Sequence, residues 1–411
     1  MEKILEQYGR VTVYMESNHP SPMYHVDGGV EPNPYGNLAV LLEDDNLEEV
    51  MYNGGAQCVK VAHRDHGMCR TNVWVDDQQG LEIAKNIAAF TSVPLGDGPG
   101  MVPIFDGRLP DGSRVNGTIP PVSPDGPTLT IRKFREDPLT MIDLIKFGTV
   151  NVRLAAMMWV WIEGLDSRPA NFVIAGGTGS GKTTTLNCLG MYIPWHKRLL
   201  TVEDTAELQV YHDHWLRMET RRERPDGTPE VDMNDCLKSS LRMRPDRIIV
   251  GEVRSSEAAT LLTAMNTGHD GSFGSLHANT AMETITRMIN PPMNVPPIML
   301  TGLDLIIIQA RLYVGGKTAR KITEVAEVAG MEGDKPRLNA IWKYNAATDQ
   351  IEETGIPSKM RETICTAAGI TPAQFEQHVK QREQILADLL NRDIRDIETV
   401  TKVIQSFYAS R

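Results

Sequence analysis

The 411-residue sequence has few cysteines and no excess of positive charge. Its five cysteines are scattered and form no C-x-x-C pair, which excludes a disulfide framework and predicts reduced thiols in a cytosolic protein. The formal net charge of -11 argues against a nucleic-acid backbone as the main partner, because phosphate binding needs clustered Lys and Arg. A local basic patch stays compatible with this charge.

Long apolar stretches are also absent. No uninterrupted apolar run approaches the ~20 residues that span a bilayer, and the amino end does not resemble a signal peptide. We therefore expect any membrane contact to be made through a partner protein. The apolar fraction of 41% and the charged fraction of 23% are those of a globular protein, and the length allows two domains.

Turn residues and apolar periodicity divide the chain near residue 137. Residues 1–137, broken by Pro and Gly, predict a strand-rich α+β domain with short strands such as 11–14 and 128–131 and one helix near 82–90. In residues 138–411, helical spacing over 141–147 and 154–162 precedes apolar strands alternating with helices, and the tail from about 357 is helical. The predicted strands are 172–175, 199–202, 248–250, 272–276 and 306–308. Such alternation predicts an α/β domain with a mostly parallel sheet covered by helices.

A phosphate-binding motif follows the first of these strands. Residues Gly176–Thr183 (GGTGSGKT) fit G-x-x-x-x-G-K-[ST], between the strand Phe172–Ala175 and a helix expected from Thr184. Backbone N–H groups of such a loop wrap the phosphates of ATP, Lys182 reaches the β- and γ-phosphates, and the Thr183 hydroxyl binds Mg²⁺. The predicted nucleotide-binding residues are Gly177, Thr178, Gly179, Ser180, Gly181, Lys182, Thr183 and Thr184.

Polar side chains follow three other predicted strands, where a doubly wound sheet binds its ligand. The strand 199–202 runs into Glu203, Asp204 and Glu207, and a carboxylate there could polarise the attacking water. The strand 248–250 is followed by Gly251-Glu252, in position to reach Mg²⁺, and the strand 272–276 by His277, in position to contact the γ-phosphate. Each has a plain alternative as a helix cap or a surface polar residue. Their order after the phosphate loop favours the functional interpretation.

Together these segments resemble the secretion ATPase superfamily, the motors of type II and type IV secretion, type IV pili and archaeal flagella. The resemblance is carried by the phosphate loop, the acidic segment 203–207, the segment 241–254 ending in Gly251-Glu252-Val253-Arg254, and the histidine segment 267–280. It implies a RecA-like P-loop domain that hydrolyses ATP with Mg²⁺. It also implies Glu207 as the catalytic glutamate, Glu252 as the Mg²⁺-linked glutamate and His277 as the sensor of the nucleotide state.

The same resemblance extends to the amino-terminal domain and to the partners. Segments 109–116 and 131–135 look like those that bring arginines to the nucleotide, which makes Arg114, Arg132 and Arg135 candidates; the alternative is solvated surface arginines. The resemblance implies a homohexamer in the cytoplasm, peripheral at the inner face of the membrane, that acts on a polytopic membrane platform protein. Sequence-specific nucleic-acid binding is not expected.

The sequence also bears on the branch of the superfamily and on competing functions. The lack of C-x-x-C pairs differs from bacterial type II motors, and the tail looks like the archaeal and Tad-like branch, so we expect archaeal-type pilus assembly. The first alternative is a conjugation-type motor that exports DNA or effector proteins. Others are an ATP-gated scaffold with incidental turnover, and a small-molecule kinase, for which no acceptor pocket or lid is recognisable.

Residues 63–69 (HRDHGMC) bring several potential metal ligands close together. They lack the paired spacing of a zinc site, so we interpret them as a strand and turn.

Overall fold

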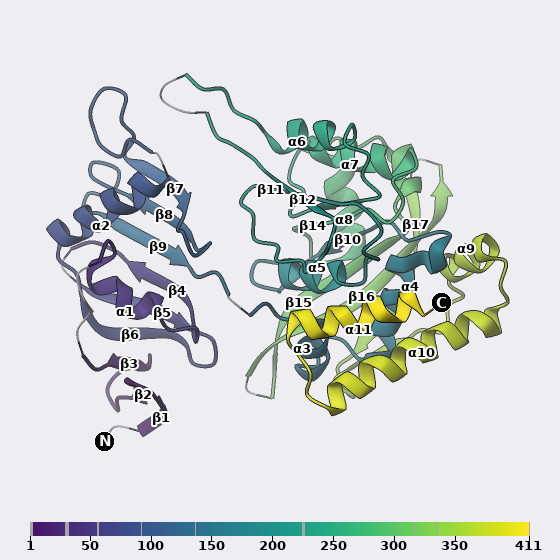
Figure 1. The fold of residues 1–411 in the computed structure, drawn as a ribbon, viewed down its shortest axis with the longest axis horizontal. Coiled ribbons are helices and arrows are strands. Elements are labelled where there is room, and N and C mark those ends of the chain that lie inside the picture. Colours follow the sequence, from purple (N-terminus) through teal and green to yellow (C-terminus); the bar gives the residue numbers. More distant parts are fainter. Residues whose placement is uncertain are drawn as a thin grey trace. The chain divides into compact units, whose positions relative to one another are not determined.

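The computed structural model describes residues 3–28, 33–55, 57–91, 93–135, 137–223, 227–315, 317–333 and 335–410. The chain forms two compact units (Figure 1). The first spans Met1–Glu136, and the second contains Asp137–Arg222 and Pro229–Arg411. Each has its own hydrophobic core.

The first unit is built on one sheet. Over its described residues nine strands lie in the order β1-β2-β3-β6-β5-β4-β9-β8-β7, and all neighbours pair antiparallel except β3 and β6. The strands are β1 (Lys3–Tyr8), β2 (Val11–Met15), β3 (Met23–Val26), β4 (Leu47–Tyr52), β5 (Cys58–His63), β6 (Gly67–Trp74), β7 (Ile104–Arg108), β8 (Arg114–Thr118) and β9 (Thr128–Arg132). The short helices are η1 (Gly36–Leu38) and α1 (Ala39–Leu42).

The longest helix of this unit, α2 (Asp77–Phe90), packs on the sheet. It begins after Asp76, whose side chain accepts a hydrogen bond from the backbone of Gln79 in a capping box. Ile83 and Ile87, one turn apart, are buried in the core with strand residues. The helix predicted near 82–90 is therefore present, and it begins earlier because the Asp76 cap satisfies its first N–H groups.

The second unit is organised around a mixed sheet in the order β12-β11-β13-β14-β10-β15-β16-β17-β18, over its described residues. The six strands from β12 to β15 are parallel, and the last three join antiparallel. The strands are β10 (Phe172–Ala175), β11 (Leu199–Glu203), β12 (Trp215–Glu219), β13 (Arg247–Val250), β14 (Phe273–Leu276), β15 (Leu305–Val314), β16 (Lys317–Glu332), β17 (Lys335–Asn345) and β18 (Gln350–Glu353). The predicted α/β class with a mostly parallel sheet is confirmed.

Helices cover both faces of this sheet (Figure 1). Phe172 and Ile174 of β10 join a core with α3, α4, α5, α9, α10 and α11, whereas Val173 and Ala175 join a core with α6, α7 and α8. A strand buried on both faces reads as a continuous apolar run. The helices are α3 (Met141–Lys146), α4 (Val152–Glu163), η2 (Gly164–Asp166), α5 (Lys182–Gly190), α6 (Met233–Ser240), α7 (Glu257–Asn266), α8 (Ala281–Ile289), η3 (Pro297–Gly302), α9 (Lys359–Ala368), α10 (Pro372–Asn391) and α11 (Ile397–Ala409).

Two parts of this sheet differ from the sequence expectation. The strand predicted at 306–308 is the start of β15, which continues to Val314 and pairs with β16 in a long antiparallel hairpin. Alternation of exposed and half-buried residues replaces the apolar run after Gln309, so the apolar pattern ends before the strand does. The short strand β12 was also missed, because none of its residues is buried.

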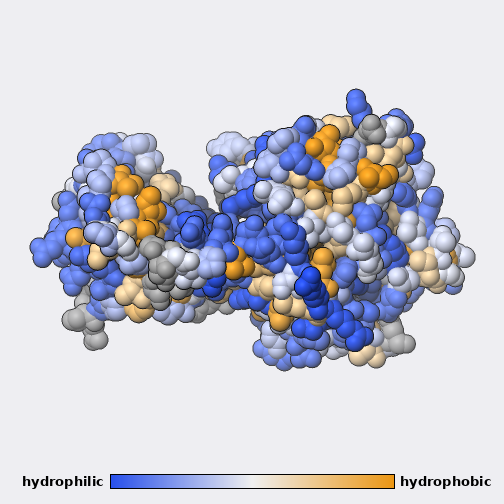
Figure 2. Space-filling model, turned by 90° about the horizontal axis from the view of Figure 1, so that it is seen from above, coloured by the Kyte–Doolittle hydropathy of each residue, from blue (hydrophilic) through white to orange (hydrophobic). Residues whose placement is uncertain are grey.

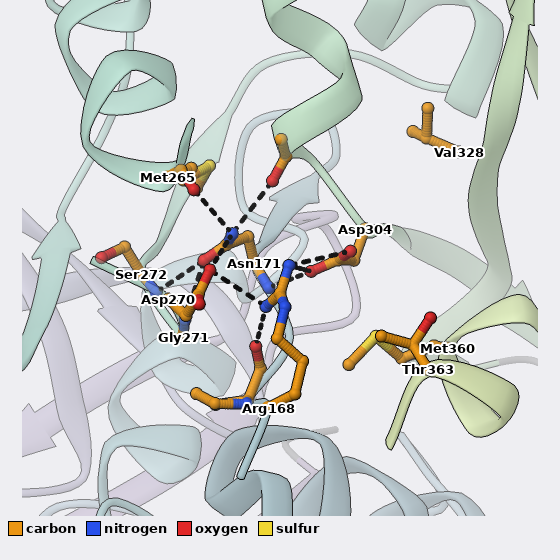
Figure 3. A network of polar contacts seen from close by, with 12 residues as sticks. Arg168, Asn171, Met265, Asp270, Gly271, Ser272, Asp304, Val328, Met360 and Thr363 are labelled. Carbon is orange, nitrogen blue, oxygen red and sulfur yellow. Dashed lines mark hydrogen bonds and ion pairs between the residues drawn. The ribbon is translucent and has the colours of Figure 1, made fainter. Parts of the chain in front are cut away.

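Asn171 joins the amino ends of three central strands (Figure 3). Its side-chain oxygen accepts from the backbone N–H groups of Gly271 and Ser272, which lead into β14, and its amide donates to the carbonyl of Gly302. Its backbone N–H donates to Asp304, the residue before β15. These bonds fix the level at which β10, β14 and β15 begin.

Figure 2 shows that the surface of both units is mainly hydrophilic in this view, with hydrophobic residues confined to smaller patches. None of the helices in the described part of the chain is both long and apolar enough to cross a bilayer.

Candidate functional site

Four chain segments leave the carboxyl edge of the parallel sheet side by side. The strands β11, β13, β14 and β10 are consecutive neighbours. The residues that follow them are the acidic segment 203–207, Glu252, His277 and the phosphate loop. The strand order therefore collects the polar segments of the sequence at one edge, as a doubly wound sheet does for its ligand.

The phosphate loop Gly176–Thr183 joins β10 to α5, which begins at Lys182 and thus earlier than the predicted Thr184. Gly181, at the N-cap of α5, has a φ of 93°, a conformation that suits glycine because it has no Cβ. Lys182 is 7% exposed, and its ammonium donates to the carbonyls of Gly176 and Gly177 at 2.9 and 3.0 Å. The pKa of Lys182 is lowered overall, because the effect of burial exceeds that of the Glu252 charge, which raises it.

Gln309, in β15, packs against the phosphate loop. Only 1% of Gln309 is exposed, and its Oε1 accepts from the Thr185 hydroxyl at 2.8 Å. A Cβ on Gly176 would lie 2.1 Å from the Gln309 carbonyl oxygen, so the loop and the strand approach as closely as glycine permits. This contact places β15 and its continuation directly beside the phosphate loop.

Glu252, His277, Arg254 and Asp204 form a charged cluster. Nε2 of His277 lies 2.7 Å from Oε1 of Glu252, and Arg254 binds the other Glu252 oxygen and Oδ2 of Asp204, the latter at 3.1 Å. Burial would raise the pKa of Glu252, but the Arg254 hydrogen bond and the charges of Arg254, His277 and Lys182 lower it overall. Burial and the Lys182 charge lower the pKa of His277. The cluster thus presents an ionised carboxylate beside a neutral imidazole at neutral pH.

Glu203 organises the acidic segment from inside. It is 2% exposed, and its Oε1 accepts from the backbone N–H groups of Glu207 and Leu208, both at 2.9 Å. Burial raises its pKa to about 7, against these two hydrogen bonds, which lower it. Glu203 therefore shapes the turn that carries the half-buried Glu207.

The residues at this edge suit a nucleoside triphosphate and a divalent cation. Ser180 in the phosphate loop is 1% exposed, and its hydroxyl has no hydrogen-bond partner among the described residues. Carboxylate, hydroxyl and ammonium groups converge on a loop of backbone N–H donors at a helix start, which is the donor set for phosphates and Mg²⁺. Such a set can hold, orient and polarise a phosphoryl group.

The three candidate arginines lie in the first unit. Arg114 on β8 is directly opposite Arg132 on β9 and Arg108 on β7, so arginines form a row across three strands. Arg135 follows β9 near Arg64, whose pKa is lowered by burial and by the Arg135 charge. Like charges directly opposite one another are unfavourable unless other groups compensate them.

His63 and His66 lie with Glu6 at the turn between β5 and β6. Their ligand atoms are within 4.8 Å of one another. However, Nδ1 of His63 accepts backbone N–H groups of Asp65 and His66 at 3.2 and 3.3 Å. A histidine bound to a metal through Nε2 carries its proton on Nδ1, and that proton would face these N–H groups. The geometry opposes a metal site here.

The sequence did not predict two residues of this site, and it suggested one residue that lies far from it. Arg254 was part of a recognised segment, but nothing in the sequence indicated that it bridges Asp204 and Glu252. Gln309 directly follows an apolar run, the same signal that pointed to Glu252. His269, which belongs to the histidine segment 267–280, lies before β14 at the opposite end of that strand from His277.

A family model described as "Type II/IV secretion system protein" matches residues 99–389. The chain therefore belongs to the type II/IV secretion system protein family, a family of nucleotide-binding secretion ATPases. This confirms the family resemblance.

Several relatives were found. An uncharacterized protein of Methanocaldococcus jannaschii is 33% identical over 545 aligned residues, covering 90% of this chain and 75% of the relative. The conjugal transfer protein TrbB of Rhizobium radiobacter is 33% identical over 302 residues, covering 71% and 87%. The X-ray structure of the Legionella pneumophila ATPase DotB has a TM-score of 0.50 at 17% identity, covering 92% and 98%, and shows a shared fold.

Proposed function

We propose that the protein is an ATP-hydrolysing motor that works on a membrane-bound secretion or pilus machine. The observation that carries the proposal is the alignment of the phosphate loop, His277, Glu252 and the acidic segment at four neighbouring strand ends. In a kinase an acceptor site would be needed beside the loop, whereas here acids and a histidine occupy the neighbouring strand ends.

The phosphate loop, from Gly177 to Thr184, would hold the phosphates of ATP, and Lys182 would exchange its loop carbonyls for phosphate oxygens. Thr183 and Glu252, the latter directly or through water, would bind Mg²⁺. When bound, Mg²⁺ supplies charge neutralisation at the phosphates. His277, a neutral imidazole beside Glu252, would sense the γ-phosphate.

Glu207 would orient and deprotonate the attacking water. Glu203 accepts a hydrogen bond from the backbone of Glu207. Arg254 contacts both Asp204 and Glu252, so it links the acidic segment 203–207 to Glu252. Arg114, Arg132 and Arg135 would add positive charge from the amino-terminal domain, residues 1–137, to the ATPase domain, residues 138–411 with its helical extension from about 357. An arginine supplied from outside the loop raises phosphoryl-transfer rates by orders of magnitude.

By analogy with the motors that its sequence resembles, the protein would act as a homohexamer at the cytoplasmic face of the membrane. It would bind a polytopic platform protein in the membrane, without inserting into the membrane itself. Closure of a domain around ATP and its release after hydrolysis convert turnover into movement. Similarity to Methanocaldococcus jannaschii proteins favours an archaeal-type pilus or secretion machine.

The test is phosphate release from Mg-ATP by the wild type and by Glu207→Gln, with the mass in solution measured with and without nucleotide. We expect hydrolysis by a hexamer, and in Glu207→Gln retained binding with turnover reduced at least hundredfold. Glu362→Gln, an exposed change on α9, is the matched control and should hydrolyse normally. A monomer whose activity survives Glu207→Gln would reject the motor.

A second candidate is a conjugation-type motor for DNA or effector export. It is favoured by the 33% identity to the conjugal transfer protein TrbB, with 87% of that protein covered. Stimulation of phosphate release by DNA would support it. The net charge of -11 points the other way, and we expect DNA to leave the rate unchanged.

A further inference from the structure

The hairpin formed by β15 and β16 carries a second cationic feature beside the phosphate loop. Residues 309–322 contain four basic residues and no acid, although the chain as a whole has a net charge of -11. The four are Arg311, Lys317, Arg320 and Lys321. Lys321 is used elsewhere, since its ammonium lies 3.0 Å from Asp349.

Arg311 and Arg320 are directly opposite each other in the antiparallel pairing of β15 with β16. Directly opposite residues on such strands project to the same face, with their Cβ atoms about 5 Å apart. Like charges in this arrangement repel each other. Among the described residues neither guanidinium has a carboxylate partner, so no carboxylate in that part of the chain offsets the repulsion.

The face that these two arginines share is the face of the phosphate loop. Arg320 donates from Nε to the carbonyl of Gly179 at 3.1 Å, and its Cδ lies 3.2 Å from where a Cβ on Gly181 would be. Nη1 of Arg311 lies 3.6 Å from the corresponding Cβ position on Gly179. The two arginines therefore border the loop on the side opposite the Glu252 cluster in strand order.

Their position is fixed from within the same unit. Gln309, two residues before Arg311 on the same strand face, is buried against Gly176 and bonded to Thr185. This buried contact fixes the position of the hairpin relative to the phosphate loop. It thereby holds the two arginines beside the phosphate site.

We infer that Arg311 and Arg320 are nucleotide-binding residues that contact the phosphate chain of a bound nucleoside di- or triphosphate. This inference rests on the proposed nucleotide site. A polyanion beside the loop would offset the repulsion between the two guanidinium groups, and their nitrogens provide charge-assisted donors for phosphate oxygens. Arg320 would keep its Nε bond to the loop and offer its terminal nitrogens.

The experiment measures the Kd of Mg-ADP and of a non-hydrolysable ATP analogue with the full-length chain at low and high salt. Arg311→Gln and Arg320→Gln should each raise both Kd values roughly tenfold, as the loss of one charge-assisted hydrogen bond predicts. The salt dependence of Kd should also flatten. Arg→Lys at either position should restore part of the affinity.

Arg337→Gln is the matched control, because Arg337 is an exposed arginine on β17 of the same sheet and should bind as the wild type. Arg311→Gln tests nucleotide binding without disturbing the phosphate loop, since Arg311 makes no hydrogen bond to the loop among the described residues. Unchanged Kd values and salt dependence in both variants, with binding lost in Lys182→Ala, would overturn only the arginine assignment. A folded wild type that binds neither nucleotide would overturn the proposed function as well.

Discussion

Nε2 of His277 lies 2.7 Å from Oε1 of Glu252, although the two residues follow different strands. The contact exists because β13 and β14 are neighbours in the sheet and end at the same edge. The pKa values of both groups are lowered, so at neutral pH an ionised Glu252 lies beside a neutral His277. A ligand that draws Glu252 toward a cation would change the partner of His277, which couples nucleotide state to the histidine segment.

His277→Ala should therefore impair turnover more than binding. We expect kcat for phosphate release to fall at least tenfold, because Glu252 loses an oriented neighbour, while the Kd for Mg-ADP changes less than about threefold. Phosphate release and a fluorescent ADP analogue measure the two quantities. His196→Ala, at an exposed loop position, should leave both unchanged. A normal kcat in His277→Ala would contradict the coupling.

Asn171→Ala should strongly destabilise the second unit. The side chain is fully buried, and its loss leaves the N–H groups of Gly271 and Ser272 without a protein acceptor (Figure 3). Unsatisfied buried groups cost about 1–3 kcal/mol each, so we expect about 3 kcal/mol in urea unfolding. Asn391→Ala, at an exposed position on α10, should cost less than about 0.5 kcal/mol.

Asn171→Asp distinguishes hydrogen bonding from volume. The carboxylate would keep the acceptors for Gly271 and Ser272 but would lose the donor to Gly302 and place a negative charge near Asp270. We expect this isosteric change to destabilise as well. A stability equal to the wild type would show that the amide donors are unimportant.

The tail of the second unit contains a buried ion pair. Arg382 of α10 is fully buried, contacts Glu163 of α4 and lies over the rings of Trp159 and Phe407. Removing one partner leaves a buried charge uncompensated, so Glu163→Gln or Arg382→Met should each cost about 3–5 kcal/mol. The double variant should recover most of this loss. Urea unfolding of the four proteins measures it, and simple additivity of the single losses would reject the pair.

This pair also marks what the sequence could and could not predict. The cap of α10 at Thr371, Pro372 and Gln374 and its apolar stripe from Phe375 to Leu389 follow from local rules, and the structure contains both. Arg382 lies inside that stripe, and its burial depends on a glutamate more than two hundred residues away. No local pattern indicates such a partner.

The candidate site also combines features that are local in sequence with features that depend on long-range contacts. The phosphate loop is local in sequence, and its glycines and lysine identify it without knowledge of the sheet. Arg311 and Arg320 become neighbours of the loop only through the pairing of β15 with β16 and the contact of Gln309 with Gly176. The hairpin was itself missed, because its apolar pattern ends at Gln309. Long-range pairing, rather than composition, positions these groups.

Glu203 should make the stability of the second unit depend on pH. Its pKa is about 7 in the folded chain, raised by burial from an ordinary 4.5, so between these values the folded state holds a proton that the unfolded state has released. Stability from this group is therefore greatest below pH 4.5 and falls as pH rises to about 7. The difference amounts to roughly 3 kcal/mol.

Urea unfolding from pH 4.5 to 8, followed by tryptophan fluorescence, measures this slope, because five of the six tryptophans lie in the second unit. Glu203→Gln keeps an Oε1 acceptor for Glu207 and Leu208 but cannot ionise, so its decline in stability over this range should be smaller by about that amount. Glu362→Gln, on the exposed face of α9, should keep the wild-type slope. If Glu203→Gln also keeps it, Glu203 is ionised throughout, and the two backbone hydrogen bonds outweigh the cost of burying its charge.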